Sequence, residues 1–156
     1  MPYTIRPAVP DDLPILLAQY AKLYDVLASF AFPFSLNTAD LPGLLSAQMQ
    51  SKMACVLVAE RAHMVCGFVV AAVSRLDRRL MHPGGNLLGT VQDIFIEPDE
   101  RGCGCASQLL QAAQDWFCES GVCAAESFVS SGNHPSAGFF TRHGFVRMGA
   151  TFYKEL

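Results

Sequence analysis

Apolar residues recur at intervals of three and four over residues 13–27, which is typical of the buried stripe of an amphipathic helix. Asp11 or Asp12 can cap this helix, and Pro14 falls in its first turn, where proline is tolerated. Residues 28–36 are rich in aromatic side chains and contain a proline, so they predict an apolar connection.

A second helix is predicted after this connection, with Asn37 or Thr38 as its cap. Four apolar residues would form its buried face: Leu41, Leu44, Leu45 and Met49. The next two runs, 53–60 and 64–74, are rich in Val, Cys and Ala and are separated by only three residues. They predict a hairpin of two buried strands.

The second half of the chain alternates between strand and helix patterns. Residues 87–96 predict a third core strand, which is followed by a helix from Cys105 to the glycine at 121. Residues 122–129 predict another strand, 136–143 a short helix, and 145–153 a final strand or hairpin.

Length and composition fit one folded domain over residues 1–156, with a mixed α/β character. The chain is 51% hydrophobic and 16% charged, which excludes a disordered protein. No apolar run reaches the roughly 20 residues of a membrane span, and the first residues lack a signal-peptide core. We therefore expect a cytoplasmic protein with no membrane partner.

Charge and cysteine content exclude further classes. The chain has 11 basic and 14 acidic residues and no basic stripe, so a nucleic-acid partner is not expected. Six irregularly spaced cysteines in a chain of this size indicate reduced thiols rather than a disulfide scaffold. There is no Cys-x-x-Cys and no histidine pair at ligand spacing, so no metal is expected.

The strongest functional signal is a glycine-rich turn between a strand and a helix. Strand residues 91–96 are followed by Glu-Pro-Asp-Glu and then by Arg-Gly-Cys-Gly-Cys-Ala at 101–106. Such a turn offers backbone N–H groups and the positive end of a helix to a phosphate anion. The alternative is a tight turn that needs two glycines and binds nothing. The dinucleotide fingerprint fails at Ser107, and a Walker loop would need Gly-Lys-Ser or Gly-Lys-Thr.

These motifs, in this order, resemble the GCN5-related N-acetyltransferase (GNAT) superfamily. The resemblance is carried by the turn at 101–106, by Asn133, by Phe-Phe-Thr-Arg-His-Gly-Phe at 139–145 and by Tyr-Thr-Ile-Arg-Pro-Ala at 3–8. The local spacing is most similar to the diamine and polyamine acetyltransferase branch. The resemblance implies an α/β (α+β) fold with one mixed, mostly antiparallel sheet, flanking helices and two parallel central strands that splay apart.

The resemblance also implies that acetyl-CoA binds between the splayed strands, with the pyrophosphate on the glycine-rich turn and the pantetheine arm along the third core strand. The expected contacts are Ile94, Phe95, Ile96, Arg101, Gly102, Cys103, Gly104, Cys105, Ala106, Ser107, Asn133 and Ser136. Ile94 and Ile96 are expected in the core in any case, and Asn133 could instead be only a turn or cap residue.

The implied reaction moves an acetyl group from acetyl-CoA to a primary amine of a small molecule or peptide by direct attack in a ternary complex. An amine is mostly protonated at pH 7, so a base must remove a proton. The polyamine branch uses a Glu and a Tyr at positions that here hold Gln92 and Phe140, neither of which transfers protons. The catalytic residues stay unassigned, and a non-catalytic acyl-CoA-binding module is the alternative.

Several residues are weaker candidates for the base. Strand alternation places Asp93 on the opposite face from Gln92, which favours a structural role for Asp93. Glu126, His134 and His143 could reach the cleft, and a base made of ordered water and backbone carbonyls is equally plausible.

For the acceptor, Tyr24 and Asp25 fall near a Tyr-acid pair of the polyamine branch, and Gln92 is a third expected contact. The aromatic run at 30–34 is either a lid over a hydrophobic amine, or core, or a dimer contact. The acids at 97–100 either favour a cationic acceptor or form a solvated turn. A homodimer is expected by analogy with the family.

Cys103 and Cys105 stand at a helix N-terminus, where a thiol has a lowered pKa and could be oxidised or modified, blocking the cofactor. The alternative is that both are small apolar fillers.

Overall fold

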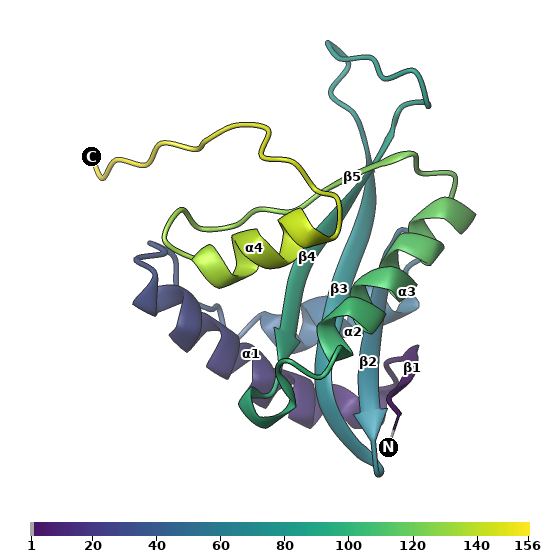
Figure 1. Cartoon of the computed structure of the whole chain (residues 1–156), viewed down its shortest axis with the longest axis vertical. Helices are drawn as coiled ribbons and strands as arrows, with labels where there is room; N and C mark the ends of the chain where they lie inside the picture. The colour runs from purple at the N-terminus through teal and green to yellow at the C-terminus, as the bar shows by residue number, and fades with distance from the viewer. Residues whose placement is uncertain (1) are drawn as a thin grey trace.

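The computed structural model describes residues 2–156, which form one five-stranded sheet with helices on both faces (Figure 1). In chain order the elements are β1 (Thr4–Pro7), η1 (Pro10–Asp12), α1 (Leu13–Ser29), α2 (Leu41–Gln50), β2 (Ala54–Arg61), β3 (Met64–Arg75), β4 (Leu87–Ile96), η2 (Pro98–Glu100), α3 (Cys105–Glu119), β5 (Ala124–Glu126) and α4 (His134–Arg142). The strand order is β1-β2-β3-β4-β5, antiparallel except for the parallel pair β4 and β5. The predicted fold class is confirmed.

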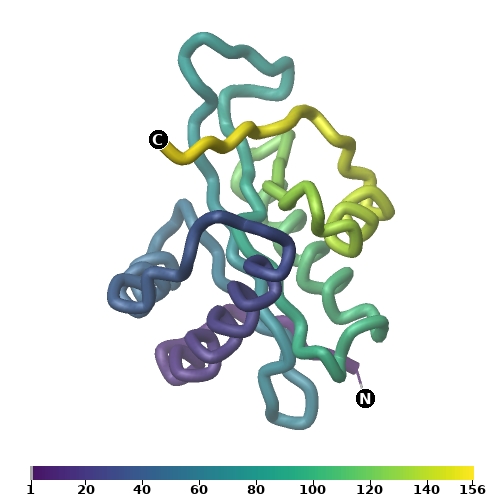
Figure 2. Tube along the Cα trace, turned by 90° about the vertical axis from the view of Figure 1, so that its left-hand side faces the viewer, coloured from purple at the N-terminus to yellow at the C-terminus, as the bar shows by residue number. Residues whose placement is uncertain are grey.

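The two faces of the sheet have separate cores. Alternating side chains of β3 point to opposite faces, so that Phe68 packs against α1 and α2 while Val69 packs against α3. Figure 2 shows α1 and α2 on one side of the strands and α3 and α4 on the other. Among the described residues, no helix is both long and apolar enough to cross a membrane.

The predicted hairpin is present and turns at Ala62 and His63. Both residues adopt left-handed backbone angles, with φ of 51° and 63°. A two-residue turn with positive φ at both positions matches the right-handed twist of the strands that it joins.

The parallel pair β4 and β5 separates after a short contact. β5 pairs with Leu88–Thr90 only, and the next link is a 2.9 Å hydrogen bond from Ser127 Oγ to the carbonyl oxygen of Val91. At the start of this pair β4 packs closely against α3. A Cβ added to Gly89 would lie only 2.8 Å from the Phe117 ring. From there to Ile96, β4 has no strand partner on this edge in the described chain. The pair therefore splays as expected, although it lies at the end of the sheet rather than at its centre.

Two strand predictions need correction. The strand predicted at 122–129 is limited to Ala124–Glu126, because the chain leaves β4 after this point. The strand predicted at 145–153 is wrong: residues 145–156 have no regular structure, and Val146 and Phe152 are 86% and 96% exposed. An alternating pattern forms a strand only where another backbone accepts its hydrogen bonds.

The helix starts also differ from the predictions. α2 begins at Leu41, because Asn37 accepts a hydrogen bond from the Asp40 N–H in a turn that precedes the helix. Leu44, expected to be buried, is 54% exposed. Asp12 precedes α1 but does not cap it, since its carboxylate is bound to Arg6 and to the Val9 N–H.

Candidate active site at the splayed strands

The glycine-rich turn is an open loop at the start of α3. Gly102 and Gly104 have φ of 76° and 82°, and a Cβ at either position would meet nothing within 4 Å. The first hydrogen bond of the helix runs from the Gln108 N–H to the Gly104 carbonyl. The N–H groups of residues 105–107 precede it and are therefore available to an anion.

Acidic residues just before the turn hold it in place from two sides. Glu97 accepts hydrogen bonds from Lys22 at 2.8 Å and from Gln19 at 3.2 Å, both on α1. Glu100 accepts a 2.7 Å bond from the Tyr3 hydroxyl and also pairs with Arg61. These two acids thus have structural partners.

A histidine links the first turn of α3 to the end of α4. His143 Nδ1 lies 2.8 Å from the Phe139 carbonyl oxygen and Nε2 lies 3.0 Å from Ser107 Oγ. A carbonyl only accepts, so Nδ1 carries a proton and donates to Phe139, while Nε2 shares a hydrogen bond with the serine hydroxyl. His143 is therefore placed to orient Ser107, and it does not line the cavity described below.

A bulge in β4 changes the direction of its polar side chains. Val70 is paired with Asp93 and Ala71 with Val91, which leaves Gln92 without a partner on β3. Gln92 accepts a 2.8 Å hydrogen bond from Gln48 on α2, and Asp93 accepts a 2.9 Å bond from Tyr20 on α1. Both side chains therefore point to the α1 and α2 face. The prediction of opposite faces is wrong, because the extra residue interrupts the alternation.

A cavity of about 220 Å³ lies where the strands separate. Its lining comes from α1, from the connection after α1, from β4, from the segment after β5 and from α4, so both faces of the sheet contribute. The lining residues are Leu23, Tyr24, Leu27, Phe32, Gln92, Asp93, Ile94, Ser127, Phe128, Val129, Ser130, Asn133, Ser136 and Phe140. Asp93 is the one acidic side chain among them.

Burial shifts the pKa values of two side chains in the cavity lining, Asp93 and Tyr24. It raises the pKa of Asp93 above the usual carboxyl range, and the hydrogen bond from Tyr20 partly opposes that shift. Burial also raises the pKa of Tyr24, and the nearby Asp93 carboxylate adds to this effect. The carboxyl group can therefore take up a proton more readily than an exposed aspartate.

The cavity lining also contains a buried hydroxyl without a hydrogen-bond partner. Ser130 is 8% exposed, and within residues 2–156 its Oγ makes no hydrogen bond. Asn133 Oδ1 accepts a 3.2 Å bond from the Ser136 N–H and so caps α4. Asn133 therefore caps α4, and it also lines the cavity.

The structure brings together only part of the predicted site. Ile94, Asn133, Ser136, Tyr24 and Gln92 line one cavity. Asp25, Glu126 and His134 are exposed and do not line it. His143 and the turn residues 101–107 do not line it either. The Phe95 and Ile96 side chains lie in the two cores. Ser127, Phe128 and Ser130 were not predicted, since no motif marks them.

The two cysteines of the turn differ in environment. Cys105 is buried, and burial raises its pKa to about 12. The lowered pKa expected at a helix N-terminus is therefore wrong for Cys105, because desolvation of the thiolate dominates. Cys103 is exposed, with Sγ 3.6 Å from the Arg101 carbonyl oxygen.

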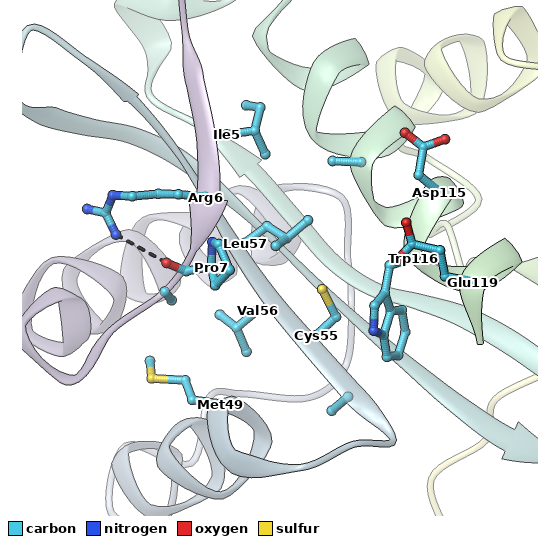
Figure 3. A pocket seen from close by; sticks show the side chains of 13 residues that line it. Ile5, Arg6, Pro7, Met49, Cys55, Val56, Leu57, Asp115, Trp116 and Glu119 are labelled. Atoms are coloured by element: carbon cyan, nitrogen blue, oxygen red, sulfur yellow. Dashed lines mark hydrogen bonds between the residues drawn. The ribbon is translucent and has the colours of Figure 1, made fainter.

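A second cavity, of about 410 Å³, lies at the β1 edge of the sheet between α2 and α3. Figure 3 shows Trp116 from α3 beside Cys55, and Arg6 donating to the Pro7 carbonyl at 3.3 Å. No residue of β4 or of the glycine-rich turn lines this cavity, so it is separate from the predicted site.

A sheet that opens between two parallel strands beside an exposed glycine-rich turn is the arrangement that the sequence resemblance implied. Residues 52–147 match the family model described as an acetyltransferase (GNAT) domain. The chain belongs to the GNAT family of acetyltransferases. No curated protein matches this GNAT domain in sequence.

Solved structures share the GNAT fold over nearly the whole chain. A transcriptional regulator from Bacillus halodurans has a TM-score of 0.80 at 18% identity, covering 99% of this chain and 100% of its own. The aminoglycoside acetyltransferase AAC(6')-Iy, in complex with a CoA-acetylneamine bisubstrate analogue, has a TM-score of 0.78 at 22% identity, covering 100% and 99%. AAC(6')-IG from Acinetobacter haemolyticus has 0.77 at 19%, covering 98% and 97%.

Proposed function

We propose that this GNAT domain transfers an acetyl group from acetyl-CoA to a primary amine of a small molecule by direct attack in a ternary complex. One observation carries the proposal: the Asp93 carboxyl lines the same cavity as Ile94 and Asn133, where the pantetheine arm is expected. A titratable group with a raised pKa beside the expected thioester supplies the base that Gln92 and Phe140 lack.

The glycine-rich turn would bind the pyrophosphate through the N–H groups of residues 105–107. The loop is open, its glycines allow close approach, and Ser107 lies in the first turn of α3. The unpaired edge of β4 after Thr90 offers backbone groups to the pantetheine arm, and its N–H groups can stabilise the thioester oxyanion.

Asp93 would first bind the acceptor as an ammonium ion. The carboxylate then takes one proton from the ammonium, and the free amine attacks the thioester carbonyl carbon. The C–N bond forms and gives a tetrahedral intermediate whose nitrogen still carries an extra proton. As the C–S bond breaks, this second proton passes to the leaving thiolate, and CoA leaves as the thiol. The proton on Asp93 returns to solvent at the end of the cycle, so charges and atoms balance.

The test is mass-detected acetyl transfer from acetyl-CoA to a panel of amines, with wild type and Asp93→Asn. Asparagine keeps the hydrogen bond from Tyr20 but cannot accept the proton, so we expect kcat/KM to fall about 100-fold or more. The Kd of acetyl-CoA should not change. Glu126→Gln, at an exposed residue of β5, is the matched control and should retain activity.

Two results would overturn this proposal. Equal kcat/KM for wild type and Asp93→Asn would remove Asp93 from the chemistry. Bound but intact acetyl-CoA with every amine would favour a non-catalytic acyl-CoA-binding module.

We also propose that the chain forms a homodimer through residues 145–156. Val146, Met148 and Phe152 are all at least 85% exposed and lie at even spacing, which places them on one face of an extended backbone. Figure 1 shows this segment, in yellow, running away from α4. A second copy would cover these apolar side chains and complete the missing backbone hydrogen bonds.

A further inference from the structure

The acceptor end of the cavity has an aromatic wall. Tyr24 and Phe32 meet edge to face with ring centroids 6.2 Å apart, and Phe128 lies 6.1 Å from Phe32. Leu23 and Leu27 complete the α1 side of this wall. Apolar and aromatic surface of this kind gains free energy when it contacts an apolar ligand.

The aromatic wall continues to the surface. Phe128 is 63% exposed and Phe34 is 60% exposed, and the Phe34 ring lies 5.4 Å from that of Phe32. An apolar group too large for the cavity can therefore lie on these rings while its amine reaches Asp93.

The cavity lining contains a single carboxyl group. Asp93 is the single charged side chain in the lining, and Asp25, one residue beyond Tyr24, is exposed and not part of it. One ammonium group would find a partner there. A second ammonium on the same small molecule would lose water without finding a second carboxylate in the lining, which costs desolvation free energy.

The other polar groups of the lining lie around the start of α4, where the proposed function expects the pantetheine arm of acetyl-CoA. Asn133 caps the start of α4 by accepting from the Ser136 N–H, and Ser130 Oγ is buried without a partner in the same cavity lining. These groups are neutral hydrogen-bonding atoms that suit the amides of a pantetheine arm and offer no site for a further cation. At about 220 Å³, a cavity that also holds the thioester leaves room for only a small amine.

We propose that the acceptor is a primary monoamine carried on a small apolar or aromatic body, such as an arylalkylamine, rather than a polyamine or an aminoglycoside. This inference rests on the proposed acetyl transfer and names its substrate class. The proposed class differs from the aminoglycosides named for the structural neighbours. An aminoglycoside carries several amines, whereas this cavity has one charged side chain and aromatic walls.

The test compares kcat/KM for phenethylamine, butylamine, spermidine and neamine with the full chain. We expect phenethylamine to exceed spermidine and neamine by at least about 10-fold, and Phe128→Ala to raise its KM about 10-fold without changing the KM of acetyl-CoA. Met81→Ala, at a residue 98% exposed in a distant loop, is the control and should change neither constant.

The outcomes separate the two proposals. Preferred transfer to spermidine or neamine would overturn the substrate class and leave acetyl transfer intact. An unchanged KM for phenethylamine in Phe128→Ala would also overturn it. Absence of transfer to all four amines and to the wider panel would refute acetyl transfer itself, and the substrate class with it.

Discussion

The Tyr20 hydroxyl donates a 2.9 Å hydrogen bond to Asp93 Oδ2 and so joins α1 to the bulged part of β4. The Tyr20 ring is itself fixed by stacking on Phe68, with centroids 4.7 Å apart. Among residues 2–156 no donor reaches Asp93 Oδ1, so one carboxyl oxygen is held and the other is free. This is the arrangement expected of a group that is positioned for a ligand.

Asp93 should make the stability of the protein depend on pH. Its pKa is raised in the folded state, so its contribution to stability is complete below the unfolded pKa of about 4 and is lost as pH rises through the folded pKa. We expect the Tm of Asp93→Asn to exceed that of wild type at pH 7 by roughly 2 to 4 °C, the change that about 1 kcal/mol gives in a domain of this size. Thermal unfolding at a series of pH values measures this, and a constant difference between the two proteins would contradict it.

Gly104→Glu should abolish acetyl-CoA binding. The left-handed φ of 82° disfavours any side chain, and the carboxylate would repel the pyrophosphate. We expect the Kd of acetyl-CoA by calorimetry to rise at least about 100-fold. Gly121→Glu adds the same group at another glycine with left-handed φ, 77°, at the far end of α3, where a Cβ also meets nothing within 4 Å, and this variant should bind normally. Retained binding by Gly104→Glu would refute the position of the pyrophosphate.

His143→Ala should raise the KM of acetyl-CoA about 5-fold and leave kcat unchanged, because the imidazole holds Ser107 by a hydrogen bond of about 1 kcal/mol. His143→Gln, which can restore one hydrogen bond, should recover part of the loss. His134→Ala, at an exposed residue of the same helix, is the control. A fall in kcat at unchanged KM would instead assign His143 to the chemistry.

The thiols of the turn should react differently with iodoacetamide. Cys103 is exposed and should be alkylated in the native protein, whereas buried Cys105 should react only after unfolding. Acetyl-CoA should protect Cys103 but not exposed Cys118, as followed by peptide mass mapping. Equal alkylation rates for Cys103 and Cys105 in the native protein would contradict this prediction.

Residues 145–156 should determine the oligomeric state. Wild type is expected to be a dimer by light scattering after gel filtration, and Val146→Asp with Phe152→Asp should be a folded monomer, since both side chains are exposed within one chain. Met81→Asp, which adds a charge at another exposed site, should stay dimeric. A monomeric wild type would refute the proposed dimer.

Several local features of this protein could be predicted from its amino-acid pattern. The spacing of hydrophobic residues predicted the positions of α1, β4 and α3 closely. Each helix buries one apolar stripe against the sheet, and β4 is one mostly apolar run within it. The turn at 101–106 could also be predicted, because two closely spaced glycines before a helix are a local pattern that depends on no distant contact.

The direction of the Asp93 side chain and the length of the last strand depend on contacts between distant segments. A bulge at Gln92 depends on the register between β3 and β4, which no pattern within β4 encodes. The segment after β5 reaches the cavity because the sheet opens there, and the alternating residues after Gly144 find no backbone partner in their own chain. Pairing between distant segments is a property of the whole fold, so these features could not be predicted from local sequence.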